Sequence, residues 1–222
     1  MNQRAADPSS PIRKLNRPYF YLPLIFLLAF ALRGCAVVTR PEVPVADAAD
    51  YHQLAIGLAE GQGYVNTAGQ KTAWRPPAYP LFLSSIYRIA GPRVSAADFV
   101  QVVIGALTVL ALVLFGTLVI GRREAVIAGF VAAVYPGFVW LPRLLLSENL
   151  SQLLLVVTLL AAALYLKTNR VWWLAAVGFV GGINALVRGG NIMVLFVLCA
   201  VLLFVALRKR SLAPRRVALG FL

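Results

Sequence analysis

Acidic and aromatic side chains gather in one polar stretch, DAADYHQLAIGLAEGQGY at residues 47–64. Asp47 and Asp50 stand three residues apart, and Tyr51 and His52 follow them directly. A carboxylate held within hydrogen-bond reach of a hydroxyl group can take its proton, which is general-base chemistry. The two acids could instead serve only the helix, with Asp47 as its N-cap and Asp50 as the acid at the N3 position. Both interpretations predict a helix that begins near Asp47.

Other charged residues lie beside the apolar runs of the chain. Arg75 precedes two prolines, and Glu148 begins an apolar run. Arg75 could simply extend its charged head to lipid headgroups, and Glu148 could complement a helix N-terminus. An acid this close to hydrocarbon is costly, however, and is by default a functional candidate. We predict Arg143, five residues earlier, as the partner of Glu148.

The elements that must position these residues are apolar helices. The chain is 60% hydrophobic and 13% charged, which is too little polar surface for a soluble protein of this size. Runs of about 20 apolar residues can cross the bilayer as helices, and none of these runs alternates with period two as a barrel strand would. We therefore predict an all-α polytopic membrane protein with about six transmembrane helices. The apolar runs are residues 19–38, 96–120, 125–141, 150–166, 171–187 and 192–207.

The basic residues fall on one side of this predicted membrane protein. The net charge is +13, yet lysines and arginines concentrate before residue 19, after the second and fourth runs, and after the sixth run. The positive-inside rule places these segments, and the N-terminus at residues 1–18, in the cytoplasm. Six of the eight acids then lie on the other side. The charge thus predicts orientation in a cell (inner) membrane rather than a nucleic-acid surface.

The segment at residues 39–95 is too long for a plain connection. Tyr51 and Leu54 lie on one stripe of the helix predicted after residue 47, and this stripe should face the membrane. Trp74 is a natural interface anchor. Residues 80–90 predict a second short helix, too short to span.

Small and polar residues within the run at 171–187 predict close helix packing. Gly178, Gly181 and Gly182 would let a neighbouring helix approach, and Asn184 would hydrogen-bond to it.

Several pieces of the polar segment occur together at family-like spacing. They are DAADYHQLA, GQGY and WRPPAYPLFLSSIY. This combination resembles the first extracytoplasmic loop of the GT-C membrane glycosyltransferases. The closest likeness is to glycosyltransferase family 39 and the protein mannosyltransferase-like group, which includes the lipid A aminoarabinose transferases, and it covers roughly residues 44–167. The resemblance implies a polyprenyl-phosphate sugar donor and an extracytoplasmic acceptor, which is a lipid, a glycan or a protein.

The family resemblance also implies roles for particular residues. Asp47, four residues before Tyr51, matches the acidic residue that the family needs for transfer, and Asp50 is the second candidate. Glu148 matches a later acidic position. Arg188 matches a basic one, although glycines follow it where the family often has proline. The residues assigned to substrate binding are Tyr51, Lys71, Arg75, Tyr79, Arg143, Glu148 and Arg188.

Two other function classes stay open from sequence, namely a transporter or flippase of a lipid-linked sugar and a non-catalytic membrane fragment. Residues 217–222 look like the start of a further apolar helix, so we expect residues 19–222 to be the N-terminal part of a larger transferase. No cofactor is firmly implied and no metal site is predicted. A divalent cation stays open, although these acids form no recognisable cation-binding loop.

Overall fold

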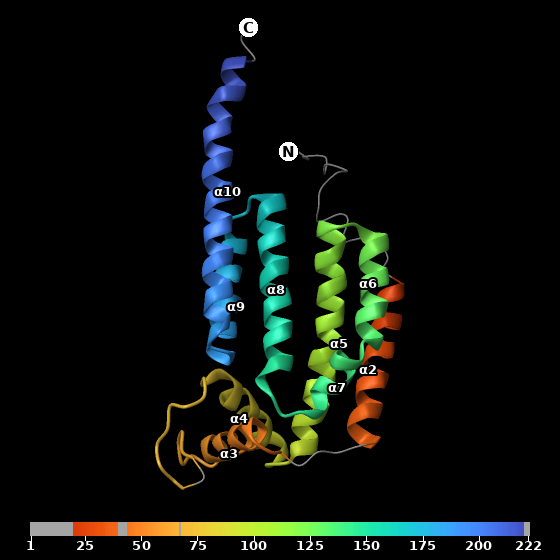
Figure 1. The fold of residues 1–222 in the computed structure, drawn as a ribbon, viewed down its shortest axis with the longest axis vertical. Coiled ribbons are helices and arrows are strands. Elements are labelled where there is room, and N and C mark those ends of the chain that lie inside the picture. The colour runs from red at the N-terminus through yellow and green to blue at the C-terminus, as the bar shows by residue number, and fades with distance from the viewer. Residues whose placement is uncertain (1–19, 40–43, 67, 220–222) are drawn as a thin grey trace, which may run out of the picture.

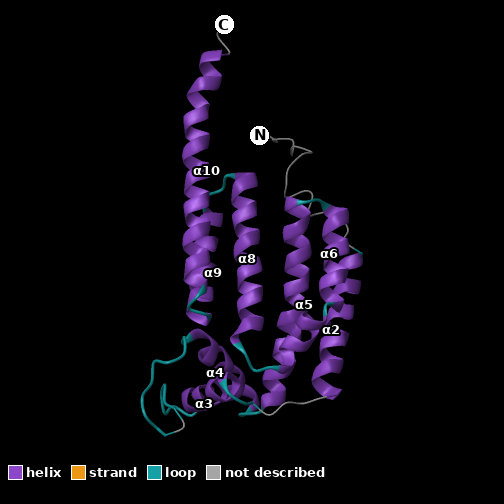
Figure 2. Cartoon of the chain, viewed as in Figure 1, coloured by secondary structure: helices purple, strands orange, loops and turns teal. Residues whose placement is uncertain are grey.

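The computed structural model describes residues 20–39, 44–66 and 68–219, and this part of the chain is built from helices (Figures 1 and 2). It contains no strand, only an isolated bridge between Val65 and Lys71. The basic tail predicted at residues 1–18 lies outside the described residues. The elements are α2 (Tyr21–Thr39), α3 (Asp47–Ala59), α4 (Ala78–Ala90), α5 (Val94–Val119), α6 (Arg122–Val134), α7 (Pro136–Trp140), the 3₁₀ turn η1 (Leu141–Arg143), α8 (Ser147–Thr168), α9 (Trp172–Val187) and α10 (Asn191–Leu219).

The all-α polytopic fold is confirmed, although the described residues give four or five candidate spans rather than the six predicted. Four helices are long and apolar enough to cross a membrane: α2, α5, α8 and the first part of α10. A fifth span is formed if α6 counts together with the segment from α7 to η1, which is bent from it by 55°. The helix α9, with 16 residues, is the remaining, shorter apolar helix of the described chain.

The bend after α6 replaces the single helix predicted at residues 125–141, and its cause is Pro136. Proline has no N–H group, so the carbonyl of Ala132 loses its helical donor. Arg33 of α2, which is buried, donates to the carbonyl oxygen of Ala132 at 3.5 Å and to that of Ala133 at 3.1 Å. Carbonyl groups within hydrocarbon must find partners inside the protein. Arg33 therefore caps the broken end of α6 from a neighbouring helix.

The helix α5 is the central element of the bundle, because it packs against α2, α6 and α8. The helix α9 packs against α8 and α10. Most of the exposed large apolar side chains belong to the bundle helices, with α10 especially rich in them. This is the distribution expected where lipid covers the helices.

The helix α9 tests the packing predicted from its glycines. A Cβ atom at Gly181 would lie 2.6 Å from Leu195 of α10, whereas one at Gly178 or Gly182 would meet nothing within 4 Å. The prediction of close approach is thus confirmed for Gly181 and wrong for the other two. Asn184 accepts a hydrogen bond at 3.1 Å from the first residue of α10, as predicted for this side chain.

The helices α3 and α4 pack together across one end of the bundle (Figure 1). Tyr51 and Leu54 are buried within the protein, so the apolar stripe of α3 is present but packs on the protein core rather than facing the membrane as predicted. Tyr51 and Tyr79 share a core with Leu145 before α8 and Val187 at the end of α9. This core fixes α3 and α4 to the ends of α8 and α9.

Candidate functional site

Asp47 and Asp50 lie in the first turn of α3, as expected, but they do not cap it. The N-cap residue is Ala46, and no side chain forms a cap hydrogen bond. The N-cap role predicted for Asp47 is therefore wrong. Ala46 has a positive φ of 50°, an uncommon conformation for a non-glycine residue, directly before the first acid. The two carboxylates are left to bind another group.

That group is the guanidinium of Arg75. Its Nη2 atom lies 2.6 Å from Oδ1 of Asp47 and 2.8 Å from Oδ2 of Asp50, and its Nε atom is 3.2 Å from the same Asp50 oxygen. The hydrogen bonds that Arg75 donates, to Asp50 first and to Asp47 second, raise the pKa of Arg75. Arg75 bonds one oxygen atom of each acid, which leaves Oδ2 of Asp47 and Oδ1 of Asp50 for another ligand. The side chains of Asp47 and Asp50 are 59% and 50% exposed, so both remain accessible.

The loop between α3 and α4 holds Arg75 in place. The hydroxyl of Tyr64 donates to the carbonyl oxygen of Arg75 at 2.9 Å, and the carbonyl of Pro76 lies 3.3 Å away. Burial, followed by the neighbouring Tyr51, raises the pKa of Tyr64 to about 12, so this hydroxyl keeps its proton. The guanidinium carbon also lies 5.4 Å from the centre of the Tyr51 ring. The cation is thus fixed by its backbone as well as by the acids.

Tyr51 and Tyr79 connect the acids to the core. Their rings meet edge to face at 4.9 Å. Tyr79 is fully buried, which raises its pKa, and its hydroxyl donates to the side-chain oxygen of Gln101 at 3.3 Å. Gln101 in turn donates to the carbonyl of Leu144 at 3.0 Å. Tyr79 therefore packs beneath Tyr51 on the core side and links it to Gln101 of α5. Gln101 was missed from sequence, although a polar residue in an apolar run is a signal of this kind.

A second charged pair lies at the start of α8. Oε1 of Glu148 is 2.6 Å from Nη1 of Arg188, which directly follows α9. Arg143, which we predicted as the partner of Glu148, is instead buried with its guanidinium 3.6 Å from the centre of the Trp140 ring. The structure therefore brings together Glu148 and Arg188, two candidates that lie 40 residues apart in sequence.

Tyr51 and Ser147 connect the group around Arg75 to the pair formed by Glu148 and Arg188. The Tyr51 hydroxyl donates to Oγ of Ser147 at 3.4 Å, and Ser147 lies 3.5 Å from Oε2 of Glu148. Both distances are long, so these are weak hydrogen bonds. Ser147 was not among the predicted site residues, although its place directly before Glu148 was visible in the sequence.

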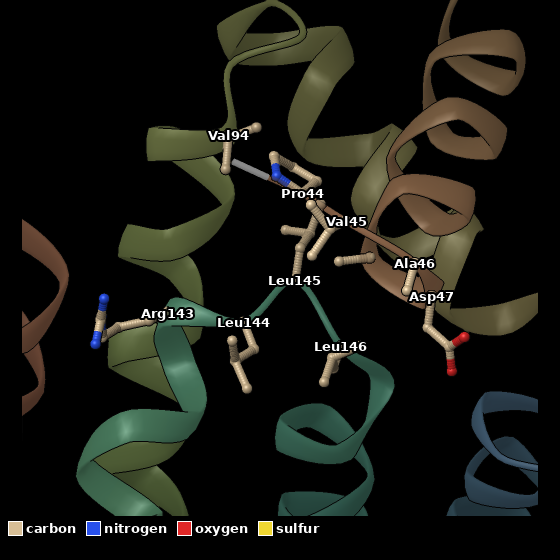
Figure 3. A pocket seen from close by; sticks show the side chains of 10 residues that line it. Pro44, Val45, Ala46, Asp47, Val94, Arg143, Leu144, Leu145 and Leu146 are labelled. Atoms are coloured by element: carbon tan, nitrogen blue, oxygen red, sulfur yellow. The ribbon is translucent and has the colours of Figure 1, made fainter. Parts of the chain in front are cut away.

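A largely apolar cavity of about 270 Å³ lies beside Asp47 (Figure 3). It is lined by residues 44–48 before and within α3, by residues 143–146 before α8, and by Val94. Figure 3 shows Asp47 and Arg143 pointing away from each other at opposite sides of this lining. Asp47 thus borders a largely apolar space in addition to its ion pair with Arg75.

The candidate Lys71, and the histidine beside Tyr51, lie apart from these groups. Lys71 is exposed and pairs with Val65 in the isolated bridge, and no contact recorded for the described residues joins its side chain to the acids. Nδ1 of His52 and the Tyr87 hydroxyl share a hydrogen bond at 2.8 Å. Within the described ranges, no group of three or more His, Cys, Asp or Glu residues is placed to hold a metal ion.

Comparison with known proteins gives a family match over most of the chain. The family described as dolichyl-phosphate-mannose-protein mannosyltransferase matches residues 74–222. No curated protein and no solved structure matches the chain. The family match begins beside Arg75 and includes Glu148 and Arg188, whereas α3 with its two acids precedes it.

Proposed function

The chain belongs to the dolichyl-phosphate-mannose-protein mannosyltransferase family and is a membrane glycosyltransferase, and from this premise we propose how it acts. We propose that it moves a sugar from a polyprenyl-phosphate donor to a hydroxyl group of an extracytoplasmic acceptor. The observation that carries the proposal is the pair of accessible carboxylates on Arg75 at the bundle end formed by α3 and α4.

The proposed base is Asp47, with Asp50 as the second candidate. The acceptor hydroxyl attacks the anomeric carbon, its oxygen forms the new glycosidic bond, and its proton passes to a free carboxylate oxygen. The bond between the anomeric carbon and the phosphate oxygen breaks at the same time. Such a single displacement needs only one base, in contrast to the two carboxylates of retaining hydrolases.

The leaving group is the polyprenyl phosphate, which keeps the electron pair of the broken bond. A fixed cation stabilises this negative charge, and arginine suits a phosphate because it can form two parallel hydrogen bonds. Arg75 is already bound by two acids. Arg188 is 49% exposed and has one acidic partner, so it is the better phosphate ligand of the two.

The apolar cavity beside Asp47 suits the part of the donor nearest the phosphate. Its lining includes Val94, Leu144, Leu145 and Leu146, which would accept an isoprenoid unit. The carboxylate would then stand at the boundary between the lipid and the aqueous acceptor. This arrangement supports a lipid-borne sugar as the donor.

The test is a transfer assay of the full chain in lipid, with labelled polyprenyl-phosphate sugar and a panel of acceptors. We expect replacement of the base, Asp47→Asn, to lower the rate by about 10²- to 10⁴-fold, the usual contribution of a general base. Asp50→Asn should lower it less. If both single variants retain full transfer, neither acid is the base.

The same assay separates the other function classes. Movement of the lipid-linked sugar across the bilayer without transfer would indicate a transporter or flippase. A transporter should bind its substrate at mid-membrane between broken helices. Asp47, Asp50 and Glu148 lie instead at the bundle end near α3, and the buried Arg33 at the broken helix α6 is used as a cap for backbone carbonyls. Neither transfer nor movement would leave a non-catalytic membrane protein.

A further inference from the structure

A second cavity, of about 190 Å³, borders Asp50 and Arg75. Its other walls are Gln53 and Leu54 of α3 and residues 66, 72 and 74 of the following loop. Unlike the apolar cavity beside Asp47, this one carries carboxylate, guanidinium, amide and hydroxyl groups together with the Trp74 indole. Its composition is that of a site for a polar ligand with one apolar face.

Trp74 is presented to this cavity by an ordered loop. Its side chain is 80% exposed, although its backbone N–H donates to Oγ1 of Thr72 at 3.3 Å. The side-chain oxygen of Asn66 accepts hydrogen bonds from the backbone of Ala68 at 3.0 Å and of Gln70 at 2.9 Å. The Val65–Lys71 bridge adds to these bonds, and the Tyr64 hydroxyl lies against the carbonyls of Arg75 and Pro76. Together they connect the two ends of the loop. These hydrogen bonds fix the backbone that carries Trp74 at the border of the cavity.

A pyranose ring has the chemistry that this cavity matches. One face of such a ring carries C–H groups that pack on an indole, and its edge carries hydroxyl groups that bond to carboxylates and amides. An aromatic body with a fixed orientation gives large contact area at little entropy loss. Bilayer anchoring, which the sequence suggested for Trp74, does not explain the polar side chains of Asp50, Gln53 and Asn66 beside it.

We propose that this cavity is a sugar subsite in which a pyranose ring stacks on Trp74 and hydrogen-bonds to Gln53 and Asp50. The inference rests on the proposed transferase function and deepens it. Asp47 borders the apolar cavity and Asp50 borders the polar one, while Arg75 holds both acids. The carboxylate pair thus separates a lipid side from a sugar side. The ring could come from the donor headgroup or from a saccharide acceptor, since both present the same chemistry.

The test is fluorine NMR of the full chain in nanodiscs, labelled with 5-fluorotryptophan. Trp74→Phe assigns the Trp74 resonance, and Trp172, an exposed tryptophan at the start of α9, is the internal control. The probes are a panel of methyl pyranosides, a short-chain polyprenyl-phosphate sugar, and the same phosphate without sugar. We expect a saturable shift of the Trp74 resonance with a sugar-bearing probe and no shift of the Trp172 resonance.

The arms of the experiment identify the source of the ring. A shift with a free methyl pyranoside assigns the cavity to the acceptor, and a shift only with the lipid-linked sugar assigns it to the donor headgroup. The proposal is overturned if no sugar shifts the Trp74 resonance, or if the phosphate without sugar shifts it equally. It is also overturned if only lipids carrying a paramagnetic label in the headgroup region affect it, which would mean bilayer anchoring.

Variants measured by saturation transfer to the bound saccharide give a second readout. We expect Trp74→Ala and Gln53→Ala to weaken binding about tenfold each, as removal of an anchor residue does, and Trp74→Phe to retain most of it. The unchanged resonances of the other tryptophans would show that a variant is folded. Binding is measured without transfer, so this inference can fail while Asp47→Asn still abolishes transfer. Conversely, sugar binding without any transfer would support the sugar subsite and contradict the proposed transferase function.

Discussion

Arg75 is the residue on which the geometry of the candidate site depends. A single guanidinium reaches both acids through Nη2 and adds a bond from Nε to Asp50. Because Asp47 and Asp50 lie within one helical turn of each other, their charges would repel without this cation. Arg75 therefore fixes which carboxylate oxygens remain free for an acceptor.

The first residue-scale prediction follows from this geometry. Lysine carries one compact charge and cannot reproduce the planar fork of arginine. We expect Arg75→Lys to lower the transfer rate about tenfold or more, since a misplaced catalytic group loses rate steeply. Arg88→Lys is the matched control, because within the described part of the chain Arg88 of α4 bonds only the carbonyl of Leu58, at 2.9 Å. Equal losses in both variants would contradict a special role for Arg75.

The second residue-scale prediction concerns pH and His52. Burial lowers the pKa of His52 below its ordinary 6.5, and its Nδ1 atom shares a hydrogen bond with the Tyr87 hydroxyl. Burial, followed by Asp98, raises the pKa of Tyr87, so this hydroxyl stays protonated beside the histidine. As the pH falls below 6.5, the unfolded chain binds a proton at this histidine before the folded chain does. The stability of the folded protein therefore decreases as the pH decreases.

The measurement is the melting temperature of the detergent-solubilised protein between pH 5 and 7. We expect the wild type to lose stability as the pH falls below 6.5. In His52→Gln the amide oxygen can still accept from Tyr87 but cannot titrate, so the loss should be smaller. An identical pH profile in the two proteins would assign the effect to other groups.

At the scale of the helices, α6 approaches α5 closely at Gly129. A Cβ atom at Gly129 would collide with Cγ2 of Val113, a branched side chain that cannot easily rotate away. Gly178 of α9 faces open space. The same substitution should therefore have opposite consequences in the two helices.

We expect Gly129→Ala to destabilise the protein by about 1–3 kcal/mol, the usual effect of overpacking. Gly178→Ala should be neutral or stabilise it by up to about 1 kcal/mol, because alanine favours the helix over glycine. Denaturation of both variants with SDS in mixed micelles, followed by circular dichroism, gives the comparison. A larger loss for Gly178→Ala would mean that the described contacts do not decide helix packing here.

At the scale of the whole molecule, the bundle has two distinct ends. The helices α3 and α4 with the acids lie across one end, and the turn between α5 and α6 lies at the other (Figure 1). The charge distribution predicts that the end with the acids faces away from the cytoplasm. A lipid-linked donor presented on that side requires this orientation.

Cysteine labelling of intact cells tests the orientation. In a background with Cys35 and Cys199 replaced by alanine, an impermeant maleimide should label Gln70→Cys in the loop before α4. Arg123→Cys at the start of α6 should react only after the cells are opened. Both positions are exposed in the structure. The reverse pattern would place the acids in the cytoplasm and remove the proposed acceptor side.

The sequence by itself determined the helices, because in hydrocarbon every backbone group must be bonded within its own segment and long apolar runs leave few alternatives. It also determined that α3 carries an apolar stripe, since helical periodicity is a local property, but the partner of that stripe was the protein core and not the membrane. The break at Pro136 lay within reach of the same reasoning, but its capping by Arg33 from α2 did not.

Only the tertiary structure decided which charges meet. Arg75 binds acids 25 and 28 residues before it, and Glu148 binds Arg188 rather than the nearer Arg143. Local patterns identify charged residues at helix ends, but a long side chain selects its partner by the packing of distant helices. The physical reason is that a charged hydrogen bond depends on distances of a few ångströms, and these distances are fixed by contacts far apart in the chain.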